Sequence, residues 1–334
     1  MSKLRVAIIG LGMAAGHHAR AVLALAHRVE CVAAYSPTAG RRQAFSAEFG
    51  IPTVGGPDEI FEDPSIRAVL ILTPPNTHLE LVRRATEARK HILLEKPLDV
   101  SLERAEAIVS LARDAKLLLG MVLQNRFRPG AMKLDEIVKS GRLGELVEAS
   151  AALRNWRPQS YYDEAGRGTW ARDGGGVLLT QAIHVIDLLL SYAGTPVDVV
   201  SYVRTTPVHR METEDLVAAV FSFESGAIGS LNATTAAYPG FPERIELIGT
   251  KGTAILSGER LDVSFADGTS ERVIGGNTSG GAGANPMAFG HESHLALIEN
   301  FVDAIETGSP LRVTGEDALK THRFIDAILT AGRT

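Results

Sequence analysis

Short apolar runs alternate with helical patterns along the first part of the chain, up to about Val122. Five runs are apolar almost without interruption: Leu4–Ile9, Glu30–Tyr35, Ala68–Leu72, His91–Leu94 and Leu117–Val122. Such runs are typical of strands that are buried on both faces. Between them, apolar residues recur with helical spacing, as in Ala39–Phe49, Leu79–Ala88 and Leu102–Ala115. This alternation predicts an α/β unit with a parallel, doubly wound sheet.

After Leu146 the pattern changes to strands that follow strands. The predicted strands are Val147–Leu153, Val197–Arg204, Leu216–Phe223, Ala227–Thr234, Arg244–Ile248 and Thr253–Leu256. Short turns that contain glycine link them, which is typical of antiparallel pairs. Helical patterns cover Gly176–Tyr192, His291–Glu306 and Gly315–Leu329, and Thr314 and Asp317 have the spacing of a capping box before the last helix. The second part of the chain is therefore predicted to be α+β.

The length of the chain predicts two domains. A chain of 334 residues, 45% of them apolar, is long enough to fill two cores. The segment Gln124–Pro129 is polar, basic and ends in proline, which favours a boundary there. We therefore predict a nucleotide-binding domain over 1–123 and an α+β domain over 124–334, whose terminal helices are free to pack back on the first. The stretch Gly275–Ala284 contains five glycines, and we expect either a lid or, more simply, a surface hairpin tip.

The charge balance argues against a nucleic-acid or membrane partner. The chain has 34 basic and 39 acidic residues and a formal net charge of −5, so it has no field that would hold a polyanion. Its one cysteine, Cys31, lies in an apolar run and excludes an internal disulfide. The chain enters a strand within a few residues of its start, without a basic or apolar leader, and no apolar run is long enough for a membrane span. These features predict a cytoplasmic protein.

A glycine-rich turn follows the first predicted strand directly. It reads Gly10-Leu11-Gly12-Met13-Ala14-Ala15 and opens a helical pattern. In this setting the glycines let backbone amides approach a pyrophosphate at a helix start, and the alanine replaces a third glycine that serves helix packing. The turn predicts a Rossmann-type site for NAD or NADP, with the cofactor at Gly10, Gly12, Met13 and Ala14.

The end of the second strand bears on the choice between the two cofactors. An NAD-preferring site carries an acidic residue there, whereas this chain has Ser36 and Thr38, followed by Arg41 and Arg42. Hydroxyl and guanidinium groups suit a 2′-phosphate, which a carboxylate would repel. The pattern favours NADP without excluding NAD, and the two arginines also fit the simpler role of residues on a solvated helix face.

Two further motifs follow the third and fourth strands. The first is Thr73-Pro74-Pro75-Asn76-Thr77-His78, and the second is Glu95-Lys96-Pro97. Because ligands bind at the carboxyl ends of parallel strands, both are expected at the cofactor. His78 also fits the role of a helix-start residue, and Lys96 is expected beside the nicotinamide, where it would polarise a carbonyl or hydroxyl. The contacts assigned to these motifs are Thr73, Pro74, Asn76, His78, Glu95, Lys96 and Pro97.

Four ordered motifs resemble the Gfo/Idh/MocA family of glucose-fructose oxidoreductases, inositol dehydrogenases and related enzymes. They are the glycine-rich turn, the segment Thr73–His78, Glu95-Lys96-Pro97, and the segment Gly174–Asp187. The resemblance covers almost the whole chain. It implies a Rossmann domain, a C-terminal substrate-binding domain with a mainly antiparallel open sheet that mediates dimers or tetramers, and NAD(P)-linked redox chemistry on sugars, cyclitols or related rings. No metal is expected, since the sequence shows no cysteine/histidine cluster or HExxH spacing.

The resemblance also assigns the residues that carry the chemistry. Lys96 matches the lysine that hydrogen-bonds the reacting oxygen, and His184 matches the histidine that exchanges the proton, a role that suits imidazole near neutral pH. Many members carry an aspartate one helical turn before this histidine, where this chain has Thr180. Thr180 shares the face of His184 and is assigned to the catalytic set, but it cannot supply a carboxylate's charge. Asp187 has two interpretations, assistance to His184 or an ion pair.

Aromatic and basic residues in the segments between the motifs are expected at the substrate. Aromatic faces and guanidinium groups suit a polyol or a carboxylated ring, although packing between domains explains the same residues equally well. Asn125 is assigned to the cofactor. The substrate contacts assigned are Arg126, Trp156, Arg157, Tyr162, Trp170, Thr180 and His184; Arg154, Tyr161 and Arg172 lie in the same segments.

The sequence therefore predicts an NADP-preferring dehydrogenase that interconverts a secondary alcohol and a ketone on a carbohydrate-like ring, as a homodimer or homotetramer. Two alternatives stay open. One is a dehydrogenase of an aromatic dihydrodiol that uses the same residues. The other is a regulatory protein that binds NADP without turnover, and such a protein would need neither Lys96 nor His184.

Overall fold

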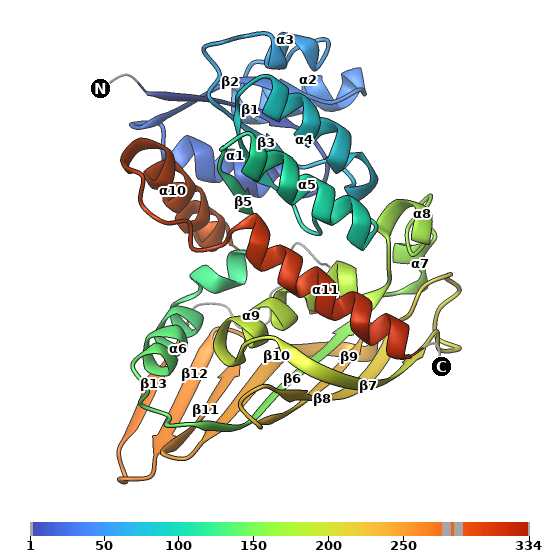
Figure 1. Ribbon diagram of the computed structural model, residues 1–334. Coiled ribbons are helices and arrows are strands. Elements are labelled where there is room, and N and C mark those ends of the chain that lie inside the picture. The colour runs from blue at the N-terminus through green and yellow to red at the C-terminus, as the bar shows by residue number, and fades with distance from the viewer. Residues whose placement is uncertain (1–2, 276–281, 284–289, 333–334) are drawn as a thin grey trace. The chain divides into compact units, whose positions relative to one another are not determined.

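The computed structural model describes residues 3–275, 282–283 and 290–332 (Figure 1). The chain divides into two compact units. The first comprises Met1–Gln124 and Gly290–Leu319, and the second comprises Asn125–Phe289 and Lys320–Thr334. The 290–319 segment, which the sequence placed in the range 124–334, thus belongs to the first unit. Most of the glycine-rich stretch Gly275–Ala284 lies outside the described residues.

Within the described residues, the first unit is built on a five-stranded parallel sheet in the order β2-β1-β3-β4-β5. Ile9 of β1 pairs with Tyr35 of β2 on one side and Ile71 of β3 on the other. The strand order reverses at β1, so right-handed crossovers place helices on both faces and leave a switch point between the ends of β1 and β3. The strands are β1 (Leu4–Ile9), β2 (Val29–Tyr35), β3 (Ala68–Ile71), β4 (His91–Leu94) and β5 (Leu119–Met121).

Helices pack in pairs around this sheet. α1 packs on α10 and α4 packs on α5 (Figure 1). Arg28, just after α1, binds α10 through Asp303 at 2.7 Å and Glu306 at 2.6 Å. Although α10 is distant in sequence from the other elements, it is an integral part of the first unit. The helical elements are α1 (Ala15–Ala24), α2 (Ala39–Phe49), α3 (Asp58–Phe61), η1 (Pro75–Thr77), α4 (His78–Glu87), α5 (Leu102–Asp114) and α10 (Glu292–Thr307).

The described part of the second unit forms an eight-stranded sheet in the order β13-β12-β11-β10-β6-β9-β8-β7. Neighbouring strands are antiparallel except β6 and β9, which are parallel. The prediction of a mainly antiparallel sheet is confirmed. The strands are β6 (Leu146–Trp156), β7 (Pro196–Arg204), β8 (Leu216–Phe223), β9 (Ile228–Thr234), β10 (Ala236–Gly249), β11 (Gly252–Ser257), β12 (Arg260–Phe265) and β13 (Ser270–Val273).

Helices cover one face of this second sheet. α6 and α9 pack on it, and the second part of α11 reaches β7 and β8 (Figure 1). There the rings of Phe324 and Phe221 lie 5.0 Å apart, and Ser201 Oγ donates to Ile328 O at 2.6 Å. The helical elements are η2 (Gln124–Phe127), α6 (Pro129–Lys139), α7 (Gln159–Tyr162), α8 (Trp170–Asp173), the π-helical turn η3 (Leu178–Ala182), α9 (Ile183–Ala193) and α11 (Gly315–Ala331).

Several elements differ from their predictions. β10 is much longer than the predicted strand Arg244–Ile248, and β12 was not predicted, although Arg260–Phe265 alternates exposed or half-buried residues with buried ones. The predicted helix Gly176–Tyr192 starts with a π-helical turn before it becomes regular. The capping box is confirmed, because Asp317 N–H donates to Thr314 Oγ1 at 3.1 Å and Thr314 N–H donates back to Asp317 Oδ2 at 3.1 Å.

One stretch of the described chain, Trp170–Ala193, has the length and hydropathy of a membrane span, with a mean hydropathy of 1.5. However, 72% of its most apolar window is buried inside the protein. A buried core helix passes the same test of length and composition. The packing of α9 on β6 and β10 accounts for the apolar residues of this stretch.

Candidate nicotinamide-cofactor and catalytic site

Gly10, the residue directly after β1, lies at the switch point of the first sheet. Its φ is +106°, a conformation that other L residues rarely adopt. A Cβ atom here would lie 2.6 Å from the carbonyl carbon of Leu72 and 2.8 Å from Thr73 N. Gly10 N–H also donates to Tyr35 O at 2.8 Å. The turn thus passes directly against the backbone that follows β3, as the first glycine of a dinucleotide-binding turn requires.

The next glycine of the turn faces open space. Apart from Gly12 itself and its two chain neighbours, no atom of the described residues lies within 4 Å of the Cβ position of Gly12. α1 begins shortly afterwards at Ala15, and its first turn has neither a side-chain cap nor an acidic residue. The N–H groups of such a helix start carry partial positive charge and suit a phosphate. The turn that holds Gly12, Met13 and Ala14 therefore fits the pyrophosphate of a dinucleotide.

The two arginines after β2 have different surroundings. Arg42 donates from Nη1 to the carbonyl oxygens of Ser36 at 2.6 Å and Pro37 at 3.3 Å. Ser36 itself is buried, and its Oγ accepts the Thr38 N–H at 3.4 Å. Arg41 extends from the exposed face of α2. Arg42 therefore fixes the backbone of this turn, while Arg41 is exposed to solvent.

His78 joins the loop after β3 to the segment after β4. Its Nε2 lies 2.9 Å from Thr73 O, and its Nδ1 lies 3.0 Å from Leu98 O and 3.1 Å from Pro97 O. Burial lowers the pKa of His78, because a charged imidazole would lose its hydration. The side chain is fully buried. In the structure the ring therefore holds these two segments together, and the cofactor contact assigned to His78 stays a prediction.

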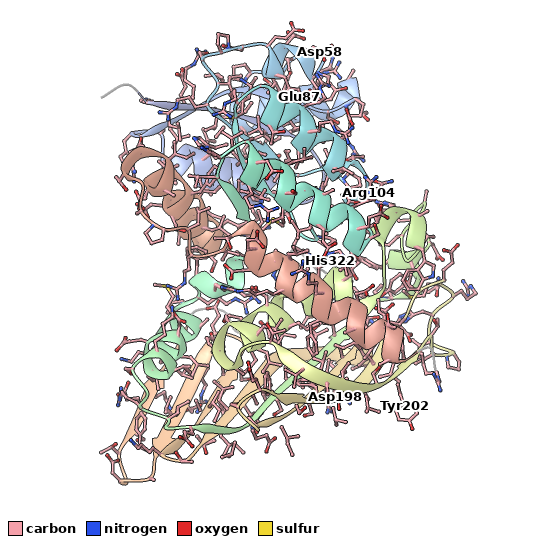
Figure 2. The ribbon with its side chains drawn as sticks, viewed as in Figure 1. Asp58, Glu87, Arg104, Asp198, Tyr202 and His322 are labelled. Atoms are coloured by element: carbon pink, nitrogen blue, oxygen red, sulfur yellow. The ribbon has the colours of Figure 1, made fainter. Side chains whose placement is uncertain are left out.

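Asp99 holds the same two segments from its own buried position. Its carboxylate accepts the N–H of Leu79 at 3.1 Å and pairs with Arg104 Nε at 2.6 Å. Arg104, labelled in Figure 2, also donates from Nη2 to Asn76 O at 3.1 Å. The predicted cofactor residue Asn76 is thus held in η1 through Arg104 and Asp99. The loop geometry at the switch point rests on this pair and on His78.

The Glu95-Lys96-Pro97 segment leaves the sheet at the end of β4. Glu95 N–H donates to Ile71 O at 2.9 Å, and Lys96 N–H donates to Oε2 of the Glu95 side chain at 3.0 Å. The other carboxylate oxygen of Glu95, Oε1, lies 3.2 Å from Nε2 of His18. The Lys96 side chain is half-buried. The backbone that carries Lys96 is therefore fixed by the preceding carboxylate.

In the second unit, Thr180 and His184 lie on consecutive helical segments. Thr180 is in the π-helical turn η3 and His184 is in the first turn of α9, and both are half-buried. Thr180 Oγ1 lies 2.5 Å from Gly176 O and also contacts Gln181 Oε1. The sequence predicted that Thr180 and His184 share one face of a regular helix, at i and i+4. The π-helical turn interrupts this regular spacing at Thr180. Turns of this kind are often found at functional sites.

Glu214 caps the helical segment that carries His184. Its carboxylate accepts the N–H of Gly176 at 2.9 Å and of Leu178 at 3.0 Å, and its carbonyl accepts the N–H of Val177 at 2.8 Å. Burial raises the pKa of Glu214, although the hydrogen bonds from the backbone favour its charged form. A Cβ atom on Gly176 would collide with the Glu214 carbonyl oxygen. The glycine therefore makes room for the capping residue.

Replacing Glu214 by glutamine is expected to lower the free energy of unfolding by about 1–3 kcal/mol. The amide NH2 would face one of the two N–H groups that the carboxylate now accepts, which leaves that donor buried without a partner. Urea denaturation of the variant and the wild type measures the difference. Glu224→Gln, on the exposed turn between β8 and β9, is the matched control. A Glu214→Gln variant as stable as this control would contradict the capping role.

Two residues assigned from the sequence are held by ion-pair networks. Arg126 forms two parallel hydrogen bonds with Asp187, Nε to Oδ2 at 2.7 Å and Nη2 to Oδ1 at 2.6 Å. Asn125 Nδ2 donates to Glu243 Oε1 at 3.4 Å, beside the ion pair of Glu243 with Arg128. Of the two interpretations of Asp187, assistance to His184 or an ion pair, the structure shows the ion pair. The assignments of Arg126 to the substrate and Asn125 to the cofactor stay predictions.

Two of the predicted substrate residues are interior residues of the second unit. Arg157 is buried, and its Nη1 donates to Trp156 O at 2.8 Å and Ala282 O at 3.3 Å. Tyr162 is buried as well, with its hydroxyl 2.8 Å from Thr235 Oγ1. Burial lowers the pKa of Arg157 and raises the pKa of Tyr162. In the structure both side chains make contacts inside the second unit, and the substrate contacts assigned to them stay predictions.

Other aromatic residues of this segment keep exposed surface. Trp170 in α8 is 41% exposed, and Trp156 is half-buried with its ring edge-on to Tyr238 at 5.5 Å. Tyr161, also half-buried, accepts hydrogen bonds from Arg167 Nη1 at 3.1 Å and Gln181 Nε2 at 3.4 Å. Because Gln181 follows Thr180 directly, the structure brings Tyr161 to the π-helical turn.

Sequence reasoning missed several residues that shape the site. The partners of His18 and Glu214 lie 77 and 36–38 positions away in the chain, so no local motif marks them. The buried pair His209 and Asp215 was also missed; His209 Nδ1 lies 2.7 Å from Asp215 Oδ2, and its Nε2 lies 2.8 Å from Arg157 O. Asp99 had a weak local signal, since it lies two residues before Ser101, the N-cap of α5.

Two family models match this architecture. One, described as an oxidoreductase family with an NAD-binding Rossmann fold, matches residues 4–122. The other, described as a GFO/IDH/MocA C-terminal domain, matches residues 131–255. The chain belongs to the Gfo/Idh/MocA family. It is thus a nicotinamide-dependent oxidoreductase, and the α/β nucleotide-binding unit and the α+β unit are those of that family.

Similar proteins align over nearly the whole chain. A myo-inositol 2-dehydrogenase of Thermotoga maritima is 27% identical, with 94% of this chain and 92% of the relative covered. The scyllo-inositol 2-dehydrogenase (NAD(+)) of Bacillus subtilis is 25% identical, with 95% and 90% covered. The WlbA dehydrogenase of Bordetella pertussis, solved with NADH and UDP-GlcNAcA, superposes with a TM-score of 0.87 at 25% identity, with 99% and 97% covered.

Proposed function

We propose that this Gfo/Idh/MocA protein is an NADP-preferring dehydrogenase that interconverts a secondary alcohol and a ketone on a sugar, cyclitol or sugar-derivative ring. The observation that carries the proposal is the switch point of the first unit. There the glycine-rich turn packs against the backbone at Thr73, while Lys96 follows the end of β4 at the carboxyl edge of the same sheet. The names of the inositol dehydrogenases and of the sugar-nucleotide complex support the ring class.

Lys96 and His184 have different roles in the proposed reaction. When bound, the nicotinamide cofactor supplies or takes up the hydride. Lys96 donates a hydrogen bond to the reacting oxygen and stabilises the negative charge that develops on it. His184 accepts the hydroxyl proton during oxidation and returns one to the oxygen during reduction. The half-buried positions of both side chains fit groups that meet a substrate and exclude part of the solvent.

The preference for NADP is assigned to the exposed guanidinium of Arg41. Arg42 is engaged with backbone carbonyls, and no carboxylate stands at positions 35–38 to repel a 2′-phosphate. Arg41→Ala is expected to weaken NADPH binding about 5–30-fold, as the loss of one charge-assisted contact implies, and to leave NADH binding unchanged. Gln43→Ala, exposed on the same helix, is the control. Fluorescence titration with both cofactors measures this; equal losses for NADPH and NADH would contradict the assignment.

The uncovered face of the second sheet is proposed to bind a second copy of this chain. Val200 of β7 pairs directly with Val220 of β8, and both side chains are more than half exposed. Tyr202, labelled in Figure 2, continues the same face at 69% exposure. Ile228 extends this face onto β9. Because helices cover the opposite face, a contiguous apolar surface of this kind fits a subunit interface. Homodimers or homotetramers are the proposed assemblies.

Val220→Glu is expected to convert the assembly into smaller species, because a carboxylate at the centre of this face would be buried without a partner. Light scattering after size-exclusion chromatography measures the mass. Gln43→Glu, exposed on α2 of the first unit, is the control and should keep the wild-type mass. A wild-type protein that is monomeric at all concentrations would contradict the proposed interface.

A cytoplasmic location without nucleic-acid or membrane partners is proposed as well. The net charge of −5 supports the proposed absence of nucleic-acid and membrane partners. Burial raises the pKa of Cys31 to about 12, so this thiol stays protonated and unreactive, as suits a reducing compartment.

A further inference from the structure

Three side chains from separate elements of the first unit meet beside Lys96. They are His18 of α1, Glu95 after β4 and His294 of α10, and their nitrogen and oxygen atoms lie within 4.8 Å of one another. His18 and His294 are buried, and their rings meet edge to face at 5.0 Å. His17 stacks on His294 at 5.5 Å. α1, the segment after β4 and α10 thus converge on a single carboxylate.

Two histidines and a carboxylate are also a common ligand set for zinc or iron. The ring nitrogens of His18 argue against this interpretation, because its Nδ1 has no hydrogen-bond partner among the described residues. A metal on Nε2 would place the ring proton on Nδ1, whereas metal-bound histidines almost always donate that proton to an acceptor. With the proton on Nε2, His18 instead donates to Glu95 Oε1 at 3.2 Å. The cluster is better explained as a hydrogen-bond network.

We propose that His18 is a positioning residue for Lys96 that acts through the carboxylate of Glu95. His18 holds Oε1, while Oε2 accepts the backbone N–H of Lys96 at 3.0 Å. One carboxylate therefore connects α1 to the backbone atom from which the lysine side chain is placed. His294 packs against the ring of His18 and fixes its orientation. The proposal rests on the role of Lys96 in the proposed function.

The pKa of Glu95 supports a role for its carboxylate as a constant hydrogen-bond acceptor near neutral pH. Burial alone would raise the pKa of Glu95, but the hydrogen bond from His18 and the nearby charge of Lys96 lower it to about 2. Burial lowers the pKa of His294 to about 3. The neighbouring His18, His17 and His291 also lower this pKa, whereas Glu95 raises it. A carboxylate with a depressed pKa contributes stability above its unfolded pKa of about 4.3 and loses it as the pH falls through about 2. The carboxylate of Glu95 therefore stays ionised, and its hydrogen bond to Lys96 N–H is kept, across the range in which a dehydrogenase is assayed.

Loss of the His18 N–H would leave a buried carboxylate oxygen without its donor. Glu95 would then have to rotate or take up a proton, and either change weakens its hydrogen bond to Lys96 N–H. A displacement of about 1 Å at a catalytic group is enough to cost about 10²-fold in rate. The effect of His18 should therefore fall on kcat, because the side chain does not belong to the open part of the cofactor turn.

Three variants test the proposal by turnover. His18→Leu removes the donor and keeps an apolar side chain, whereas His18→Gln keeps an N–H donor. We expect kcat to fall about 10–100-fold in His18→Leu, with NADPH affinity within about threefold of the wild type, and to recover in large part in His18→Gln. His17→Leu removes a neighbouring ring that stacks on His294, and it is expected to keep kcat near the wild-type value. Equal losses in His17→Leu and His18→Leu would overturn the proposal in favour of simple packing.

Hydrogen exchange at the Lys96 amide tests the same network without any substrate. We expect faster exchange in His18→Leu and restored protection in His18→Gln. Unchanged exchange in His18→Leu would overturn the positioning role, as would a stoichiometric metal in the purified protein that this variant loses. If the exchange differences are found but no ring substrate is turned over by the wild type, the proposed function fails while the network stands.

Discussion

Replacing Lys96 by methionine is expected to lower kcat by about 10²–10³-fold, the usual cost of removing a donor that stabilises charge on a reacting oxygen. Methionine keeps much of the length of the side chain but offers no N–H. The backbone hydrogen bond from residue 96 to the Glu95 carboxylate does not depend on the side chain, so the loop should keep its course. Cofactor affinity should change little. Steady-state kinetics with the cofactor at saturation measures kcat.

The matched control for this experiment is Lys139→Met. Lys139 is exposed at the end of α6, where it pairs with Asp135 at 2.9 Å. It should leave both kcat and KM unchanged. Full turnover in Lys96→Met would contradict the assignment of the catalytic lysine, and the same activity in both variants would show that the reaction does not use Lys96 at all.

Replacing His184 by asparagine is expected to lower kcat by about 10²–10⁴-fold, the range attributed to a positioned general acid or base. The half-buried position in the first turn of α9 suits a group that exchanges a proton with a bound substrate. The pH dependence of kcat should also lose the limb that reports this group. Measurement of kcat across the pH range for both proteins tests this expectation.

His27→Asn serves as the control for His184→Asn, because His27 is exposed after α1. Thr180→Ala adds a finer comparison. Thr180 cannot supply negative charge to His184, so its removal should lower kcat much less than removal of His184 itself. A Thr180→Ala variant as impaired as His184→Asn, with the same change in pH profile, would show that the threonine is required for proton exchange.

Much of the nucleotide-binding unit could be predicted because its signals are local. β1, β4 and α2 begin and end where the patterns of the sequence placed them. Buried parallel strands leave continuous apolar runs, and the glycine at position 10 is required by the positive φ at its own residue. The motifs after β1, β3 and β4 lie on neighbouring parallel strands, so their convergence followed from the topology.

The supporting residues could not be predicted, because their roles depend on partners that are distant in sequence. The sequence assigned His78 to the cofactor or to a helix start, and the structure shows its ring buried between two loops. Arg157 and Tyr162 read as ligand-binding residues, since guanidinium and phenol groups have the same chemistry in a site and in a core. Only the fold shows that both side chains point inward. The π-helical turn before His184 likewise has no periodic signal in the sequence.

The measurement that tests the central claim most directly is cofactor turnover by the purified wild-type protein with a panel of sugars, cyclitols, uronates and aromatic dihydrodiols. The account predicts a substrate-dependent change in nicotinamide absorbance with a carbohydrate-like ring, faster with NADP than with NAD, and absent in Lys96→Met. Turnover confined to the dihydrodiols would contradict the assigned ring class. Tight binding of the cofactor with no turnover on any member of the panel would contradict the assignment as an enzyme of this kind and favour a regulatory protein.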